Sequence, residues 1–275
     1  MSSRVMDSLR RIESSALAPA SALRGTWRRF ASPAVFHGWA GRAVPWFAIL
    51  AGVLAIAGST IGFLVAPTDH QQGEVYRIIF IHVPAAWMSM FIYLVAAFHA
   101  AMGLIFNTRL SALMARALAP TGALFTVIAL WTGAVWGKPT WGTWWVWDAR
   151  LTSELILLFL YLGYLALVSA IDDPRRADRG GAILLLAGVV NIPIIYFSVQ
   201  WWNTLHQGAS VSLTAAPAMA HTMLAGILLM AGACWAYSAA VALARVRCLI
   251  DEREALARRR CTSATIPSSS SPRMV

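Results

Sequence analysis

The chain contains few charged residues. Asp, Glu, Lys and Arg make up only 12% of its 275 residues, whereas 59% are hydrophobic, and the mean hydropathy is +0.63. These values lie outside the range that is usual for soluble domains. The alternating pattern of an outer-membrane β-barrel is also missing. The composition therefore argues against a soluble domain and indicates a helical membrane protein.

Several short motifs are absent as well. The three cysteines are Cys234, inside the last apolar run, and Cys248 and Cys261, in the basic C-terminal segment. They form neither a Cys-x-x-Cys pair for thiol exchange nor the Cys-x-x-Cys-His motif that attaches haem covalently. The chain also lacks a Walker A loop, so any coupling to ATP must come from a partner.

Six apolar runs reach the roughly 20 residues that a helix needs to cross a bilayer. They cover residues 45–66, 79–106, 119–137, 154–171, 182–200 and 220–244. We therefore predict an all-α, polytopic integral membrane protein with six transmembrane helices. Its transmembrane domain is expected at 45–245, after a basic cytoplasmic N-terminal extension at 1–44. Residues 246–275 are expected to form a disordered cytoplasmic tail.

The basic residues predict the orientation of these helices. On one side of the membrane, 19 of the 22 lysines and arginines fall in residues 1–44, 107–118, 172–181 and 245–275. The other side holds only Arg77, Lys138 and Arg150. This bias places both termini in the cytoplasm and the loop at 138–153 in the periplasm of a bacterial inner membrane. Residues 1–44 also have the composition of a transit peptide, so a mitochondrial origin stays open.

The net charge of +10 then reflects membrane topology and suits contact with anionic lipids. No nucleic-acid-binding motif accompanies it, so we expect no nucleic-acid partner.

An unusual cluster of tryptophans lies in the loop at 138–153. Residues 141–150 read WGTWWVWDAR and place four indole rings beside an aspartate and an arginine. An interfacial aromatic belt accounts for isolated tryptophans such as Trp46, Trp87 and Trp235. An aromatic belt explains the crowding of four rings into one loop less well. This crowding favours a stacking surface for a large planar ligand. The candidates for that surface are Trp141, Trp144, Trp145 and Trp147.

The charged members of this loop suit a ligand with acidic groups. Arg150, with Lys138 or Arg77 as further candidates, can pair with the two propionates of a haem. The ordinary scatter of basic residues in a loop is the alternative. Asp148 would be repelled by a propionate, so it is expected to orient Arg150, a loop N–H or an indole N–H. Helix capping is its other reading, although Thr152 or Ser153 is the better cap candidate.

Two of the six histidines stand apart. His82 lies among apolar residues at the outer end of the second run, and His206 follows Trp201 and Trp202 outside the fifth. A poorly hydrated imidazole stays neutral, which is the form that binds metals. Together the two histidines can bind a porphyrin iron from opposite faces. For His99 and His221 a structural role is the preferred reading.

The sequence resembles a known family at three places. WGTWWVWDARLTS at 141–153 is similar to the signature of the WWD-domain superfamily of haem-handling membrane proteins. IHVPAAW at 81–87 and WWNTLHQG at 201–208, together with the six-helix length, resemble one branch of it, the cytochrome c maturation protein C (haem exporter protein C) family. The resemblance covers about residues 45–245 and leaves out both tails.

The resemblance implies a function. In that family two outer histidines, matched here by His82 and His206, are axial ligands of non-covalently bound haem b. The tryptophan-rich loop, matched by Trp141, Trp144, Trp145, Trp147 and Asp148 with Arg150 adjoining, supports the haem. The haem is handed to a periplasmic haem chaperone for c-type cytochrome biogenesis. The implied companions are an ATP-binding subunit, a second membrane subunit and a small membrane protein in an ABC-type complex.

Two other classes of function remain as alternatives. A haem lyase or cytochrome c synthase would be an enzyme, but such relatives are longer and carry more histidines. A small-molecule transporter would need charged or broken helices at the midplane, where this chain offers His99 and a kink candidate at 191–193. We therefore expect a haem transport and hand-over protein rather than an enzyme, and leave open whether it assists the covalent haem–chaperone bond.

Overall fold

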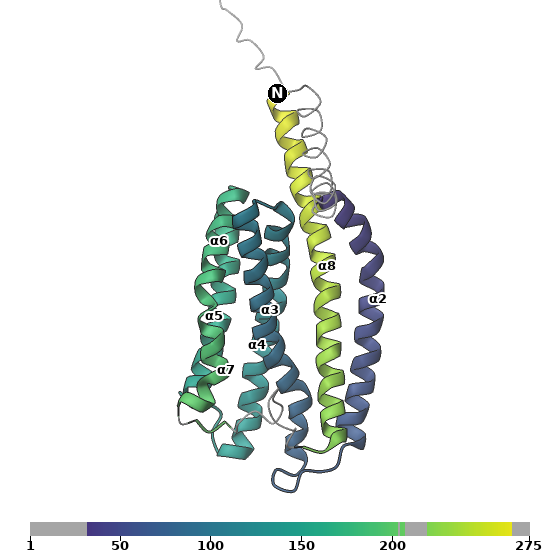
Figure 1. Cartoon of the computed structure of the whole chain (residues 1–275), viewed down its shortest axis with the longest axis vertical. Coiled ribbons are helices and arrows are strands. Elements are labelled where there is room, and N and C mark those ends of the chain that lie inside the picture. The colour runs from purple at the N-terminus through teal and green to yellow at the C-terminus, as the bar shows by residue number, and fades with distance from the viewer. Residues whose placement is uncertain (1–31, 203, 207–218, 266–275) are drawn as a thin grey trace, which may run out of the picture.

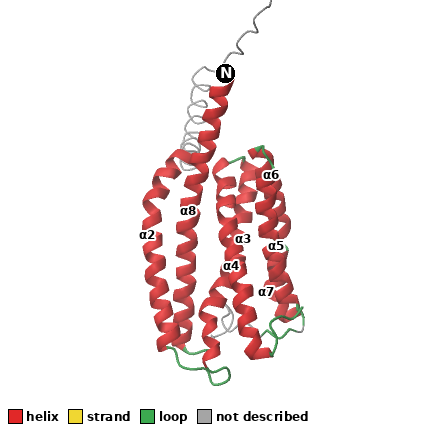
Figure 2. Cartoon of the chain, turned by 180° about the vertical axis from the view of Figure 1, so that it is seen from behind, coloured by secondary structure: helices red, strands yellow, loops and turns green. Residues whose placement is uncertain are grey.

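The computed structural model describes residues 32–202, 204–206 and 219–265 of the chain, and all its regular secondary structure is helical. Figures 1 and 2 show a bundle of nearly upright helices joined by short loops. The elements in chain order are α2 (Pro33–Thr60), a π-helical turn (Ile61–Val65), a 3₁₀ turn (Glu74–Ile78), α3 (Ile79–Phe106), α4 (Arg109–Trp141), α5 (Ala149–Ala170), α6 (Pro174–Gly188), α7 (Asn191–Trp201) and α8 (His221–Thr265).

Six helical segments of the described chain are long and apolar enough to cross a membrane, which confirms the predicted fold class. The fifth segment is made of two helices, α6 and α7, which follow each other along one span. The break between them has a local cause. Pro193 has no N–H for the Val189 carbonyl, and its ring collides with that carbonyl in a regular helix. The break lies at residues 189–190, directly before the kink candidate at 191–193.

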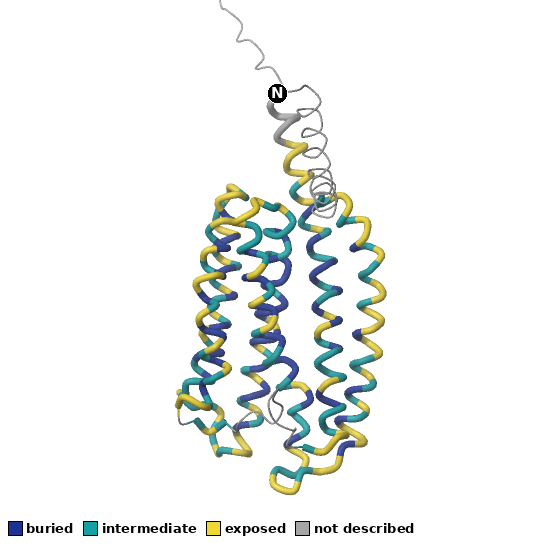
Figure 3. The backbone as a smooth tube through the Cα atoms, in the orientation of Figure 1, coloured by how far each residue is buried: buried dark blue, intermediate teal, exposed yellow. Residues whose placement is uncertain are grey.

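The helices form two unequal groups. Helices α3 to α7 enclose the main hydrophobic core, and α2 packs chiefly along α8 at the side of that group (Figure 1). Buried positions are dense along α3 and α4, whereas much of α2 is exposed (Figure 3). Glycines allow tight packing in the core: a Cβ on Gly122 would lie 2.1 Å from the Tyr161 ring. Small residues of this kind let transmembrane helices approach closely.

The first and last helices are longer than the sequence indicated. α2 begins at Pro33, ahead of the expected start at residue 45, and continues through Pro45. α8 runs to Thr265, so the disorder expected from residue 246 is wrong up to that point. Two features stabilise the extension: Val246 and Ile250 are buried against Leu113, and Arg253 pairs with Asp178 at 2.7 Å. Residues 1–31 and 266–275 lie outside the described part of the chain.

Both chain ends of the bundle lie together. The start of α2 and the C-terminal part of α8 are at the same end in Figure 1. The opposite end carries the connections from α2 to α3 and from α4 to α5, together with the end of α7 and the start of α8. The loop between α4 and α5 is shorter than the sequence indicated. Only residues 142–148 are non-helical, because α4 continues to Trp141 and α5 begins at Ala149.

Candidate functional site

His82 lies in the first turns of α3 and is held by a neighbouring helix. Its Nδ1 is 3.0 Å from Oγ1 of Thr132 on α4. The Thr132 hydroxyl donates its proton to the Ile128 carbonyl at 2.6 Å, so it accepts from His82. The proton of the neutral imidazole is therefore on Nδ1, and Nε2 keeps its lone pair.

A tryptophan fixes the other side of the His82 ring. The Trp136 indole contacts the imidazole edge-on, with ring centroids 5.6 Å apart. Its Nε1 donates to Oε1 of Gln72 in the first loop at 2.7 Å. The backbone of that loop is held in turn by Asp69, whose carboxylate accepts from the N–H groups of Gln71 and Gln72. These hydrogen bonds lower the pKa of Asp69, so its carboxylate stays charged.

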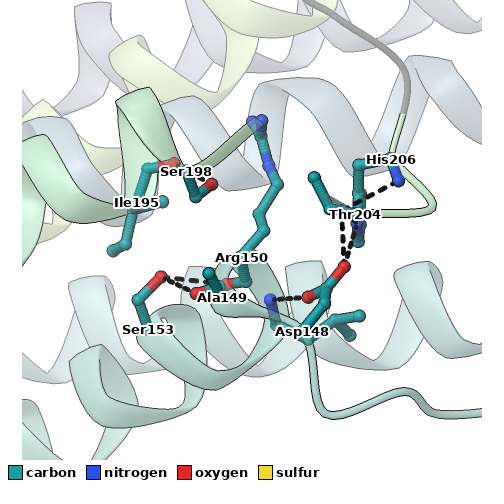
Figure 4. Close-up of polar contacts among 9 residues, drawn as sticks. Asp148, Ala149, Arg150, Ser153, Ile195, Ser198, Thr204 and His206 are labelled. Atoms are coloured by element: carbon teal, nitrogen blue, oxygen red, sulfur yellow. Dashed lines mark hydrogen bonds and ion pairs between the residues drawn. The ribbon is translucent and has the colours of Figure 1, made fainter. Parts of the chain in front are cut away.

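His206 lies beyond the end of α7 and is held by a carboxylate. Its Nδ1 is 3.1 Å from Oδ2 of Asp148, which also accepts from the Thr204 hydroxyl at 2.5 Å (Figure 4). The His206 backbone N–H donates to Thr204 Oγ1 at 3.0 Å. The imidazole also contacts the Trp141 ring edge-on at 4.8 Å between centroids.

The protonation of this pair follows from its surroundings. Burial lowers the pKa of His206 despite the attraction of Asp148. Burial alone would raise the pKa of Asp148, but hydrogen bonds from Thr204, the Leu151 N–H and His206 outweigh it and lower that pKa. At neutral pH the contact is thus a hydrogen bond from a neutral imidazole to a carboxylate. The His206 proton is on Nδ1, so Nε2 again carries the lone pair.

Asp148 has a second role at the start of α5. Its Oδ1 accepts from the Leu151 N–H at 2.8 Å, which makes it the N-cap of that helix. The expectation that Thr152 or Ser153 caps α5 is therefore wrong, because α5 begins earlier and the Ser153 hydroxyl donates back to the Ala149 carbonyl at 2.6 Å. One carboxylate joins the tryptophan loop, the first turn of α5 and the segment that carries His206.

The two histidines line one cavity of about 90 Å³ at this end of the bundle. Two charged residues of α5, Arg150 and Glu154, line it as well, and most of the remaining wall is apolar. The Ser89 hydroxyl lies 2.8 Å from Glu154 Oε1. Within the described chain no hydrogen bond or ion pair engages the Arg150 guanidinium, which carries no dashed line in Figure 4. Asp148 and Glu154 attract it only electrostatically.

The four loop tryptophans do not form one flat surface. Trp144 and Trp147 are 57% and 76% exposed. Trp145 meets Trp147 edge-to-face, with an interplanar angle of 77°. Trp141 contacts His206, and the buried Nε1 of Trp145 has no hydrogen-bond partner among the described residues. The loop therefore presents ring faces and edges at several angles, which differs from the single stacking platform that the sequence suggested.

The structure leaves other candidates outside the cavity. Arg77 pairs with Glu74 and donates to the Gly62 carbonyl, and Lys138 donates to the Gly142 carbonyl. Both basic residues are thus engaged by their own loops. His99 packs on the Phe98 ring, and its buried Nδ1 has no hydrogen-bond partner in the described part of the chain.

Four polar residues of the site were missed by sequence reasoning: Ser89, Thr132, Glu154 and Thr204. Glu154 had a readable signal, because it is an acidic residue next to a long apolar run. The three hydroxyl residues had none, because Ser and Thr are common in transmembrane helices and loops.

The fold and this arrangement define a class: a multi-pass membrane protein with two neutral histidines, an arginine and exposed tryptophans at one end. The family model described as "Heme exporter protein C" matches residues 26–261, and the chain belongs to that family. It is 50% identical over 229 residues to heme exporter protein C of Escherichia coli K12, covering 82% of this chain and 91% of the relative. The Bradyrhizobium diazoefficiens protein of the same name is 48% identical over 201 residues, covering 73% and 76%.

Proposed function

We propose that this protein binds haem at the periplasmic surface of a bacterial inner membrane and hands it to a periplasmic haem chaperone for c-type cytochrome biogenesis. The observation that carries the proposal is the pair of imidazoles lining one cavity. Each has its Nδ1 proton engaged by Thr132 or Asp148. In each, Nε2 keeps the lone pair that an iron ligand needs.

Arg150 supports a ligand with acidic groups. Its guanidinium lines the same cavity and makes no hydrogen bond or ion pair within the described chain. A partly buried cation in that state favours an anionic ligand, and a haem propionate offers two oxygens in the geometry that arginine binds best. Arg77 and Lys138 are less suited to this role because their own loops engage them.

The size of the cavity indicates how haem is held. A volume of about 90 Å³ is small beside the roughly 300–1,000 Å³ of a site that encloses a drug-sized ligand. The porphyrin therefore lies at the opening of the cavity, on the side of His206, whose ring contacts Trp141 of the tryptophan-rich loop. The exposed indoles of Trp144 and Trp147 in the same loop are available to a second protein that reaches a haem edge.

The remaining assignments rest on family membership and charge. An ABC-type complex with an ATP-binding subunit, a second membrane subunit and a small membrane protein is the proposed setting. The basic residues favour a cytoplasmic location for both termini and a periplasmic one for the tryptophan loop. On this proposal residues 45–245 form the haem-handling domain, and the basic residues on either side contact anionic lipid.

Haem transfer between purified proteins tests the proposal. The haem-loaded protein is mixed with the haem-free chaperone, and the absorption spectrum of each is recorded after separation. Transfer of the haem band to the chaperone is the expected result. A control with a Cys-x-x-Cys-His peptide distinguishes the enzyme alternative, because a cytochrome c synthase would attach haem to the peptide unaided. Attachment to the peptide without transfer to the chaperone would overturn the proposal.

A further inference from the structure

The two histidines differ in what holds them. The acceptor for His206 Nδ1 is the carboxylate of Asp148, at 3.1 Å, and burial with surrounding hydrogen bonds keeps this group charged. The acceptor for His82 Nδ1 is the neutral hydroxyl of Thr132, at 3.0 Å. The distances are similar, so the difference lies in charge. A carboxylate that accepts from the far nitrogen of a ligating histidine makes that histidine a stronger electron donor to the metal.

The two rings are held by similar sets of contacts. His206 has its backbone N–H on Thr204, its Nδ1 on Asp148 and its ring against Trp141. His82 has its Nδ1 on Thr132 and its ring against Trp136. The difference between the two ligands therefore lies in the charge of the acceptor.

We infer that the two histidines are unequal iron ligands: Asp148 makes His206 the retained ligand, and His82, held by Thr132, is the ligand that leaves the iron first. This inference rests on the proposed function, because it applies to haem bound between the two rings. Asp148 and Thr132 are positioning residues, since they act on the iron only through the imidazoles. Hand-over then begins with the haem iron still bound to His206, whose segment Asp148 connects to the first turn of α5.

Carbon monoxide identifies the ligand that leaves. It binds ferrous haem by replacing one axial histidine, and the C–O stretching frequency then reports the ligand on the opposite side. The reduced, haem-loaded protein is compared with Asp148→Asn and Thr132→Val. The expected result is a shifted C–O band in D148N and an unchanged band in T132V. A shift in T132V with an unchanged band in D148N would show that His206 leaves, and would overturn the inference.

The midpoint potential of the haem gives a second reading. Loss of the Asp148 charge weakens electron donation by His206, which favours ferrous over ferric iron. We expect the ratio of ferric to ferrous affinity to fall about tenfold in D148N, a rise of about 59 mV for one electron. T132V should move the potential by much less, and Thr132→Ser, which keeps the acceptor, should match the wild type. Equal shifts in D148N and T132V would also overturn the inference.

A further variant tests the inference if D148N does not retain haem. Thr204→Val keeps the charge of Asp148 and removes one of its donors, together with the acceptor of the His206 backbone N–H. The carboxylate then accepts more strongly from the imidazole of His206. The C–O band should then move in the direction opposite to that in D148N, or away from the wild-type band if D148N cannot be measured. An unmoved band contradicts the inference. A wild-type protein without a spectrum of two-histidine ligation overturns the proposed function itself, whereas such a spectrum with unmoved bands overturns only the inequality.

Discussion

The two ends of the bundle differ in the hydrogen bonds and ion pairs that their polar side chains make. At the end where α2 starts, Arg253 binds both oxygens of Asp178 at 2.7 and 2.9 Å, and Arg245 donates to Thr121 at 2.8 Å. At the other end, within the described residues, neither the Arg150 guanidinium nor Nε2 of either site histidine makes a hydrogen bond. These pairs hold α8 to its neighbours at the first end, although the buried Arg247 Nε has no partner among the described residues.

This difference separates structural from functional charges. Charged and metal-binding groups that line a cavity without a hydrogen-bond partner in the described chain are open to a ligand. A ligand that supplies both an anion and a metal ion satisfies Arg150 and the two imidazoles together. Substitutions at one end of the bundle that leave the other end unchanged therefore test whether haem binding and stability depend on different ends.

The largest effect is expected for the two arginines. Arg150→Gln removes a cation from the cavity but breaks no ion pair, so haem affinity should fall about tenfold or more while the melting temperature changes little. Its matched control, Arg253→Gln, should retain haem and lose up to about 1 kcal/mol of stability, because the Asp178 pair is partly exposed. Haem titration and thermal unfolding in detergent measure both. Equal haem loss in the two variants would remove the distinction between the ends.

A substitution in the core should produce the opposite pattern. A Cβ on Gly122 would lie 2.1 Å from the Tyr161 ring, so Gly122→Ala should overpack α4 against α5. We expect a loss of about 1–3 kcal/mol, with unchanged haem affinity in the molecules that still fold. Thermal unfolding and haem titration of the folded fraction are the measurements. A specific loss of haem affinity at normal stability would mean that the site depends on core packing more than the contacts indicate.

The exposed tryptophans of the loop should matter more than those facing lipid. Replacing Trp144 and Trp147 with Ala should speed haem dissociation several-fold, since each aromatic contact contributes about 0.5–1.5 kcal/mol. Trp46 is 74% exposed on α2 and lies away from the cavity, so Trp46→Ala is the matched control. Haem loss to an excess of apomyoglobin gives the rates. Similar rates for the double variant and the control would argue for an aromatic belt.

The smallest effect is expected when the pH is lowered, and it concerns the melting temperature of the haem-free protein. The pKa of His206 is lowered by burial, so the unfolded chain takes up a proton on this ring at a higher pH than the folded protein does. The stability contribution is present above pH 6.5 and declines as the pH falls below it. Between pH 7 and pH 5 the haem-free protein should lose about 1–2 °C of melting temperature through this group. The loss should shrink in His206→Gln, and an unchanged pH dependence there would contradict the assignment.

The sequence predicted the elements that depend on local patterns. Six apolar runs, a helix break just before Pro193 and a tryptophan-rich connection between the third and fourth spans are all present. His82 and His206 were expected on the same side of the membrane, and they do line one cavity. Hydrophobic length and charge bias carry this information directly.

What the sequence could not predict depends on contacts between distant segments. The Thr132 hydroxyl reaches His82 across 50 positions, and Asp148 reaches His206 across 58. No local pattern marks such pairs. The length of α8 was underestimated for a similar reason, because burial on Leu113 and an ion pair with Asp178 stabilise a segment that is rich in charge.

The most direct test of the account is the spectrum of ferric haem bound to the purified protein. The wild type should give a low-spin electron paramagnetic resonance signal typical of two imidazole ligands. That signal should be lost in both His82→Ala and His206→Ala and kept in His99→Ala. A wild-type signal that survives in either single variant of the two site histidines would show that they do not share one iron, and would contradict the account.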